Sequence, residues 1–168
     1  MHLGRNITTL LISIGLLCTA QSILADESGS FSMLTIWKRD YSMLERPGKA
    51  VTIGTLKGVN TILESSRDPF VAGNHSLSNC LVYAKKSEDS YNLEAHCTMT
   101  DVSNDKLHMG GRRHKGDTES GGGGSGVWKL LGGTGKYLDV SGTCDYRVEY
   151  LEDNWLVNTA MHCNWHRP

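Results

Sequence analysis

Cysteine side chains offer the most readily assigned chemistry in this chain. Five cysteines occur in 168 residues; Cys18 lies in an apolar N-terminal run, which leaves Cys80, Cys97, Cys144 and Cys163. An even number of cysteines in an exported chain is typical of disulfides. Binding of zinc by four thiolates is the alternative, but the long spacings between these cysteines do not fit a zinc motif. We therefore predict two disulfides and no metal site.

The spacing of the cysteines favours pairing of neighbours along the chain. The midpoint of the first two falls at Glu88-Asp89, and that of the last two falls between Asp153 and Asn154. Acidic and amide side chains of this kind are typical of turns, so each pair would close a hairpin. A two-residue turn at the second midpoint would, however, put those cysteines at a hydrogen-bonded pair, where strands are further apart. A bond from Cys97 to Cys144 therefore stays open.

Histidine is the usual acid or base near neutral pH. We expect His96 and His162 to be exposed, because each alternates with apolar neighbours that should face inward. His162 and His166 share a strand face, but residues four apart on a strand are about 13 Å apart, so they cannot hold one metal ion together. The histidines after residue 25 are His75, His96, His108, His114, His162 and His166.

Two other spacings suggest ligand sites that do not hold. Gly132–Lys136 is similar to a phosphate loop, but that motif needs glycine where Leu130 stands and Ser or Thr where Tyr137 stands. Residues 101–105 have the spacing of the first ligands of a calcium loop, yet Arg112 occupies the position of the bidentate glutamate. We expect neither a nucleotide nor a metal cofactor.

Enzymatic activity finds little support in the remaining residues. No serine or cysteine lies in a nucleophile elbow. Asp139 and Asp145 fall mostly on the outer face of the expected strands, together with Glu149 and Glu152. If Asp139 or Asp145 pointed inward beside a tyrosine, general acid catalysis by a cyclase or isomerase would become arguable.

Alternating apolar and polar residues predict strands throughout the chain after residue 25. Strand signals cover 30–38, 50–63 (either one bent strand or two pieces), 79–100 as a hairpin, 144–151 and 155–165. No stretch of eleven residues after residue 25 keeps a helical period. The hairpin over 79–100 has a consistent inner face made of Cys80, Val82, Ala84, Leu93, Ala95 and Cys97.

Turn and loop signals separate these strands. Pro47-Gly48 marks a turn, and 64–78 is loop-like. The segment 110–126, with four consecutive glycines, is expected to be a loop or connector, and the basic cluster Arg112–Lys115 within it a solvated loop.

The N-terminus and the charge indicate where the protein acts. Arg5, an apolar run too short to cross a bilayer, and small residues up to Ala25 describe a secretory signal peptide over 1–25, so we expect a secreted or periplasmic protein without a membrane span. Residues 26–168 suffice for one domain. With 17 basic and 18 acidic side chains the net charge is −1, which gives no support for nucleic-acid binding.

One segment resembles a known family. Gly126–Trp128, Gly132–Tyr137 and Ser141–Tyr146, preceded by Cys97–Asp101 and Asn104–Lys106, are similar to small secreted bacterial proteins with an allene oxide cyclase or dirigent-like barrel. The resemblance covers roughly residues 80 to 150. It implies an all-β fold, a single small antiparallel β-barrel of about eight strands, whose interior could hold one small apolar molecule. The catalytic residues of the plant cyclases cannot be placed on this chain, and none is carried over.

Three functions follow from these expectations. The chain could be a non-enzymatic barrel that binds a small apolar ligand or a protein partner, a cyclase or isomerase acting on an apolar substrate inside the barrel, or a structural or inhibitory extracytoplasmic protein with a solid barrel. Filling of the core is the simpler role for the large inward side chains. The candidates to line a ligand cavity are Trp37, Tyr146, Tyr150, Trp155, Met161 and Trp165.

Overall fold

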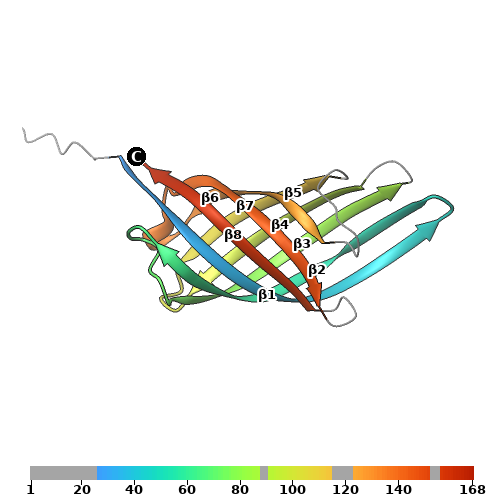
Figure 1. Cartoon of the computed structure of the whole chain (residues 1–168), viewed down its shortest axis with the longest axis horizontal. Coiled ribbons are helices and arrows are strands. Elements are labelled where there is room, and N and C mark those ends of the chain that lie inside the picture. The colour runs from blue at the N-terminus through green and yellow to red at the C-terminus, as the bar shows by residue number, and fades with distance from the viewer. Residues whose placement is uncertain (1–25, 88–90, 115–122, 152–155) are drawn as a thin grey trace, which may run out of the picture.

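Eight antiparallel strands close into a single barrel (Figure 1). A computed structural model describes residues 26–87, 91–114, 123–151 and 156–168. Each strand pairs with its neighbours along the chain, and β8 closes the barrel by pairing with β1. The strands are β1 (Glu27–Arg46), β2 (Lys49–Ser65), β3 (His75–Ser87), β4 (Tyr91–Asp101), β5 (Lys106–His114), β6 (Gly124–Gly133), β7 (Ser141–Leu151) and β8 (Leu156–Arg167). The prediction of an all-β barrel is therefore confirmed, and the expected signal peptide lies outside the described residues.

Alternation along each strand divides the side chains between an inner and an outer face. Buried residues alternate with exposed ones in β3, β7 and β8, as the period of two requires. The inner face of the cysteine hairpin is as predicted from the sequence. The core joins all eight strands and includes Phe31, Trp37, Ile62, Val82, Met99, Met109, Leu130, Val148, Met161 and Trp165.

Several strands are longer than the sequence pattern predicted. β1 begins at Glu27 and continues to Arg46, and β2 is one strand that extends to Ser65. The expected loop over 64–78 is reduced because β3 begins at His75, and the expected loop over 110–126 is wrong at both ends, where β5 and β6 extend into it. Pairing with neighbouring strands stabilises segments whose local sequence, rich in glycine and charge, is a weak strand signal.

The two disulfides join neighbouring cysteines, as the midpoints favoured. Cys80 is bonded to Cys97 across β3 and β4, and Cys144 is bonded to Cys163 across β7 and β8. The Cα atoms are 4.0 Å and 3.9 Å apart. These separations are close to the narrow spacing of non-hydrogen-bonded pairs, so the objection based on a wide pair does not apply.

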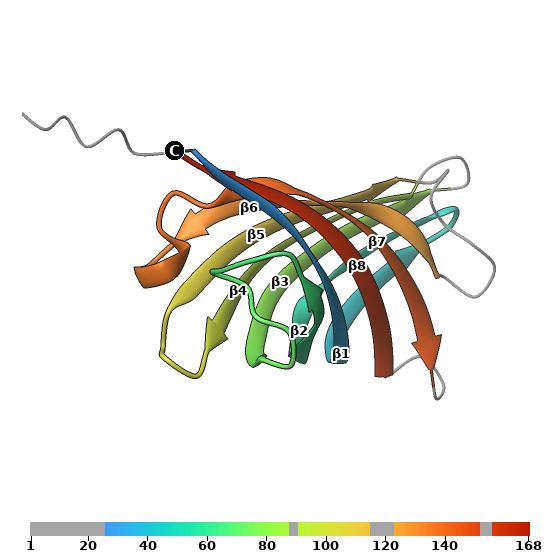
Figure 2. The ribbon, with the colours of Figure 1, turned by 60° about the vertical axis from the view of Figure 1, so that its left-hand side comes forward.

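Aromatic residues fill one end of the barrel, which we call the closed end. The segment between β2 and β3 carries Phe70, whose ring stacks on Phe31 at a centroid distance of 3.8 Å. The short helical turn η3 (Gly135–Tyr137) brings the Tyr137 ring to 5.5 Å from that of Phe70, and the Trp165 ring lies at 5.8 Å. Figure 2 shows the β2–β3 segment and η3 at this same end. No sequence pattern indicates that Phe70, a loop residue, belongs to the core.

A charged cluster fixes the segment Gly132–Tyr137 between β6 and β7, which we call the glycine corner. Lys136 Nζ lies 2.6 Å from a carboxylate oxygen of Asp101, and the other oxygen of Asp101 accepts backbone N–H groups from Ser103 and Asp105. Asp105 in turn accepts the backbone N–H of Lys136 at 3.3 Å. The residues with calcium-loop and phosphate-loop spacing therefore bind each other, and their role is to hold the closed end together.

Candidate functional site

A pocket of about 470 Å³ lies at the opposite end of the barrel, which we call the open end. Here the β1–β2 hairpin extends beyond the rest of the barrel, because from Arg39 onward β1 pairs only with β2 among the described strands (Figure 1). A volume of this size is in the range of small-molecule sites. The pocket lies between that hairpin and the ends of β3, β4 and β7. It is lined by Arg39, Asp40, Tyr41, Met43, Thr52, Val82, Ala84, Leu93 and Tyr150.

A second, smaller cavity of about 40 Å³ adjoins this pocket on the inside of the barrel. The two share Tyr41, Leu93 and Tyr150 as lining residues. Deeper in the barrel the small cavity is bounded by Trp37, Trp128, Tyr146 and Arg113, together with aliphatic residues. A molecule in the outer pocket would therefore face an aromatic floor.

Glycines on neighbouring strands set the positions of these aromatic rings. Trp37 is directly opposite Gly58, and Trp128 is directly opposite Gly111. A Cβ atom at Gly58 would lie 2.5 Å from the Trp37 ring, and one at Gly111 would lie 2.7 Å from the Trp128 ring. The indole rings thus lie flat over backbone that only glycine leaves accessible. An aromatic residue paired with a glycine across two strands is the sequence signal for this floor, but it requires the register to be known.

Arg113 corrects the expectation of a solvated basic loop. The alternation of β5 continues through Leu107, Met109 and Gly111, so that Arg113 also faces inward and is 2% exposed, whereas Arg112 is exposed and pairs with Glu94. Arg113 Nη2 donates a hydrogen bond to the phenol oxygen of Tyr150 at 3.3 Å. A guanidinium group therefore lies in the wall of the inner cavity, bonded to a tyrosine that also lines the open-end pocket.

Arg39 is the second guanidinium group of the open end. Its Cζ atom lies 5.7 Å from the ring centroid of Tyr41 and 5.5 Å from that of Tyr150, which is the geometry of cation–π contacts. Tyr150 therefore contacts Arg39 with its ring and Arg113 with its hydroxyl. No local pattern marks Arg39, Tyr41 or Arg113 as site residues, because only barrel closure shows that β1 and β5 deliver them to the same end.

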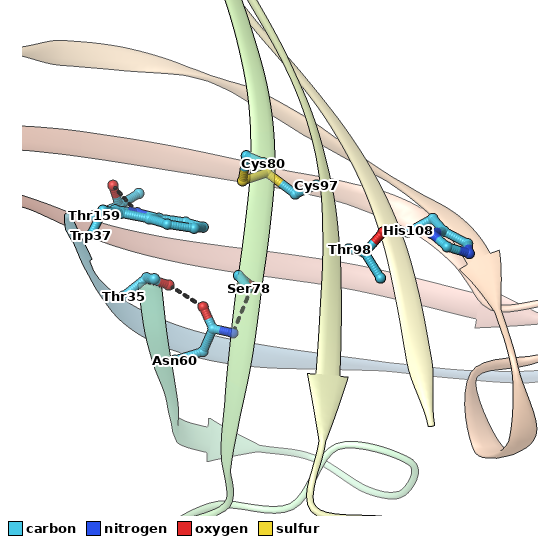
Figure 3. The surroundings of a disulfide bond; sticks show 9 residues. All are labelled: Thr35, Trp37, Asn60, Ser78, Cys80, Cys97, Thr98, His108 and Thr159. Carbon is cyan, nitrogen blue, oxygen red and sulfur yellow. Dashed lines mark hydrogen bonds between the residues drawn. A yellow bond between two sulfur atoms is a disulfide. The ribbon is translucent and has the colours of Figure 1, made fainter. Parts of the chain in front are cut away.

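The polar side chains deeper in the barrel are bonded to one another. Thr35 donates to Asn60 Oδ1 at 2.8 Å, and the amide nitrogen of Asn60 donates to Ser78 at 2.8 Å (Figure 3). The indole N–H of Trp37 donates to Thr159 at 3.1 Å. Because these groups satisfy each other, they stabilise the core rather than present free functional groups to a substrate. Figure 3 also shows the Cys80–Cys97 disulfide beside this network.

The structure divides the side chains expected to line a cavity into two groups. Trp37, Tyr146 and Tyr150 line the inner cavity at the open end. Met161 and Trp165 are buried in the packed core, and Trp165 belongs to the aromatic cluster of the closed end. Trp155 lies outside the described residues.

The candidate acid–base residues whose side chains are described lie on the outside, and Glu152 lies outside the described residues. His96 and His162 are exposed, as predicted. Asp139 and Asp145 are exposed as well, so the carboxylate that a cyclase hypothesis needs is not supplied by either. Several outer histidines bond to hydroxyl groups, for example His108 Nδ1 with Thr98 Oγ1 at 3.1 Å and His162 Nδ1 with Ser32 Oγ at 3.1 Å. Among the described residues no group of three or more His, Cys, Asp or Glu side chains could hold a metal ion.

Another hollow lies on the outer surface across β2 to β6. It has a volume of about 400 Å³ and includes Lys57, Leu81, His96, His108 and Leu131. Neither Asp nor Glu is among its lining residues. Its lining contains no phenylalanine, tyrosine or tryptophan, whereas two tyrosines line the open-end pocket.

Comparison with known proteins does not place the chain in a family. No family model matches the sequence, and no curated protein matches it. In the described ranges no helix has the length and hydrophobicity that crossing a bilayer would require.

Proposed function

We propose that this protein is an extracytoplasmic binding protein that takes up a small, mainly apolar molecule at the open end of its barrel. The observation that carries the proposal is the 470 Å³ pocket between the β1–β2 hairpin and the ends of β3, β4 and β7. Apolar and aromatic side chains with a few polar groups form its walls, as is usual for ligand sites. Two disulfides favour an oxidising compartment.

The distribution of packing supports a binding role over a solid barrel. The closed end is filled by Phe31, Phe70, Tyr137 and Trp165. At the open end Met43 is 61% exposed although it lies on the inner face of the β1–β2 hairpin. When a ligand covers an exposed apolar side chain beside a pocket, the burial of apolar surface lowers the free energy and favours binding. We also propose a relation to the allene oxide cyclase and dirigent-like barrels, which the eight-stranded barrel with one accessible end supports.

Catalysis is the less favoured function. The buried polar residues of the described ranges are Thr35, Asn60, Ser78, Arg113 and Thr159, which include neither a carboxylate nor an imidazole. A cyclase or isomerase would need such an acid or base within hydrogen-bond reach of its substrate.

A protein partner is favoured by one specific observation on the outer surface. β2 and β3 carry exposed apolar side chains there, and contiguous apolar surface is typical of interaction sites. These side chains are Val51, Ile53, Val59, Leu77, Leu81 and Tyr83. Native mass spectrometry of the protein purified from its source separates the two functions, because a bound small molecule supports the pocket and a retained second polypeptide supports the outer surface.

A pair of matched variants tests the pocket directly. Thr52 lines the pocket, whereas Thr55 lies on the outer face of the same strand and is not one of its lining residues. The uncharged fluorescent probe N-phenylnaphthylamine should bind the natural protein, and Thr52→Phe should weaken binding about tenfold by filling the space, with Thr55→Phe unchanged. Equal affinity for all three proteins, measured by fluorescence titration, would contradict the proposed site.

A further inference from the structure

The charge at the open end indicates what kind of molecule the pocket accepts. Arg39 is half-buried, lines the pocket, and lies against the rings of Tyr41 and Tyr150. No ion pair within the described ranges involves Arg39. A cation removed from much of its water gains more from an anion than an exposed one does, because screening by solvent is weaker there.

Asp40, the acidic residue next to Arg39 in the sequence, does not neutralise the Arg39 guanidinium inside the pocket. Asp40 follows Arg39 along β1, and its side chain leaves the strand on the opposite face, where the residue is exposed. The pocket lining contains no glutamate and no other aspartate. The inward-facing charge of the pocket is therefore positive.

The inner cavity also presents hydrogen-bond donors. Arg113 reaches Tyr150 from the barrel interior through its Nη2 atom. The indole N–H of Trp128, which lines the same cavity, is buried and has no hydrogen-bond partner in the described part of the chain. A buried donor without an acceptor costs free energy that an acceptor on a ligand could recover. The unpaired indole N–H of Trp128 therefore favours a ligand that carries an acceptor oxygen.

We propose that the ligand is a small aromatic acid whose anionic group lies beside Tyr150, within reach of the Arg39 guanidinium. The tyrosine rings and the aromatic floor would contact the flat apolar body, and the guanidinium would bind the acid oxygens through charge-assisted hydrogen bonds. This inference rests on the proposed function, since it assigns the chemical class of the molecule that the open-end pocket binds.

Two fluorescent probes with the same aromatic body test the assignment. Anilinonaphthalene sulfonate carries an anionic group that N-phenylnaphthylamine lacks. We expect the natural protein to bind the sulfonate more tightly, and Arg39→Gln to weaken sulfonate binding about tenfold or more while binding of the uncharged probe is unchanged. Arg39→Lys, which keeps the charge, should retain part of the difference.

Arg112→Gln is the matched control, because Arg112 is exposed on the outer face and pairs with Glu94. This variant should bind both probes like the natural protein, and unchanged binding of the uncharged probe shows that each variant is folded. Two results would show that the ligand is not an acid while leaving the proposed pocket intact. In the first, the natural protein binds both probes and Arg39→Gln changes the affinity for neither. In the second, Arg112→Gln weakens sulfonate binding as much as Arg39→Gln does. If neither probe binds the natural protein, the proposed function fails and the inference with it.

Discussion

At the scale of single residues, Asp101 shows how a motif-like spacing can have a structural purpose. Partial burial by itself raises the pKa of its carboxyl group, but hydrogen bonds from Lys136 and from the backbone of Asp105 and Ser103 outweigh burial and hold the pKa below its usual value. Burial and the nearby charges of Asp101 and Asp105 raise the pKa of Tyr137, so its phenol stays protonated at the closed end. The group that was considered as a calcium ligand is thus an anchor for η3.

The lowered pKa of Asp101 predicts a pH-dependent contribution to stability. A carboxyl group whose pKa is lower in the folded state contributes stability above its unfolded value of about 3.9, and the contribution disappears as the pH falls through the folded value. Asp101→Asn should therefore reduce the free energy of unfolding by about 1–2 kcal/mol at pH 7. The deficit relative to the natural protein should close as the pH falls below 3.9, as measured by urea unfolding at several pH values.

Asp139→Asn serves as the comparison for Asp101. Asp139 is exposed and has a φ angle of 58°, a conformation that asparagine adopts as readily as aspartate. It should unfold like the natural protein at every pH. A deficit for Asp101→Asn that stays constant down to acidic pH would show that the ionised carboxylate is not what stabilises the corner.

At the scale of elements, the glycine corner between β6 and β7 is a clamp on the β4–β5 turn. The backbone N–H of Thr134 donates to the carbonyl of Lys106, and the hydroxyl of Thr134 accepts the backbone N–H of Lys106. This exchange brings the two backbones so close that a Cβ atom at Gly133 would lie 1.7 Å from the Lys106 carbonyl oxygen. The corner therefore needs glycine for close approach rather than for binding phosphate.

Gly133→Ala should destabilise the barrel strongly. The added methyl group cannot fit beside Lys106 unless β5 and the corner separate, and disruptions of this kind cost about 3 kcal/mol or more. The melting temperature should fall clearly in Gly133→Ala. Gly110→Ala should change it little, because the nearest atom to an added Cβ there is a Leu131 methyl carbon at 3.4 Å. Similar melting temperatures for the two variants would mean that the clamp is not tight in solution.

At the scale of the whole molecule, barrel closure separates the two disulfides. β3–β4 and β7–β8 share no strand, and in the closed order β5 and β6 lie between them on one side and β1 and β2 on the other. Each disulfide holds together one hairpin, and pairing of β1 with β8 connects the hairpins into one cooperative unit.

Removal of the disulfides should have nearly independent effects. The bonds span 17 and 19 residues, for which loss of the cross-link costs about 3 kcal/mol each. The two double Cys→Ala variants should each lose about that amount, and the variant that lacks all four cysteines should lose close to the sum, because distant sites without shared partners act additively. Unfolding in guanidinium chloride measures the free energy of unfolding of all three variants. A much smaller combined loss would show that the two hairpins are coupled through the core.

The sequence by itself determined the local features of this protein. The period of two predicted the all-β class and the inner face of the hairpin over 79–100, because each side chain's direction on a strand depends on its neighbours along the chain. The midpoints of the cysteine pairs favoured both disulfides for the same reason, although the sequence left a bond from Cys97 to Cys144 open. A hairpin closes around its own turn, so its pairing is readable locally.

Only the tertiary structure decided what lies at the two ends of the barrel. Phe70 fills the closed end although it belongs to a loop, and Arg113 faces inward although it stands in a basic, glycine-rich segment. Arg39 and Arg113 are 74 positions apart in the sequence and both contact Tyr150. Their proximity depends on the strand register around the whole barrel, and no local sequence pattern contains that register. The positions of residues at each end of the barrel are set only when β8 pairs with β1.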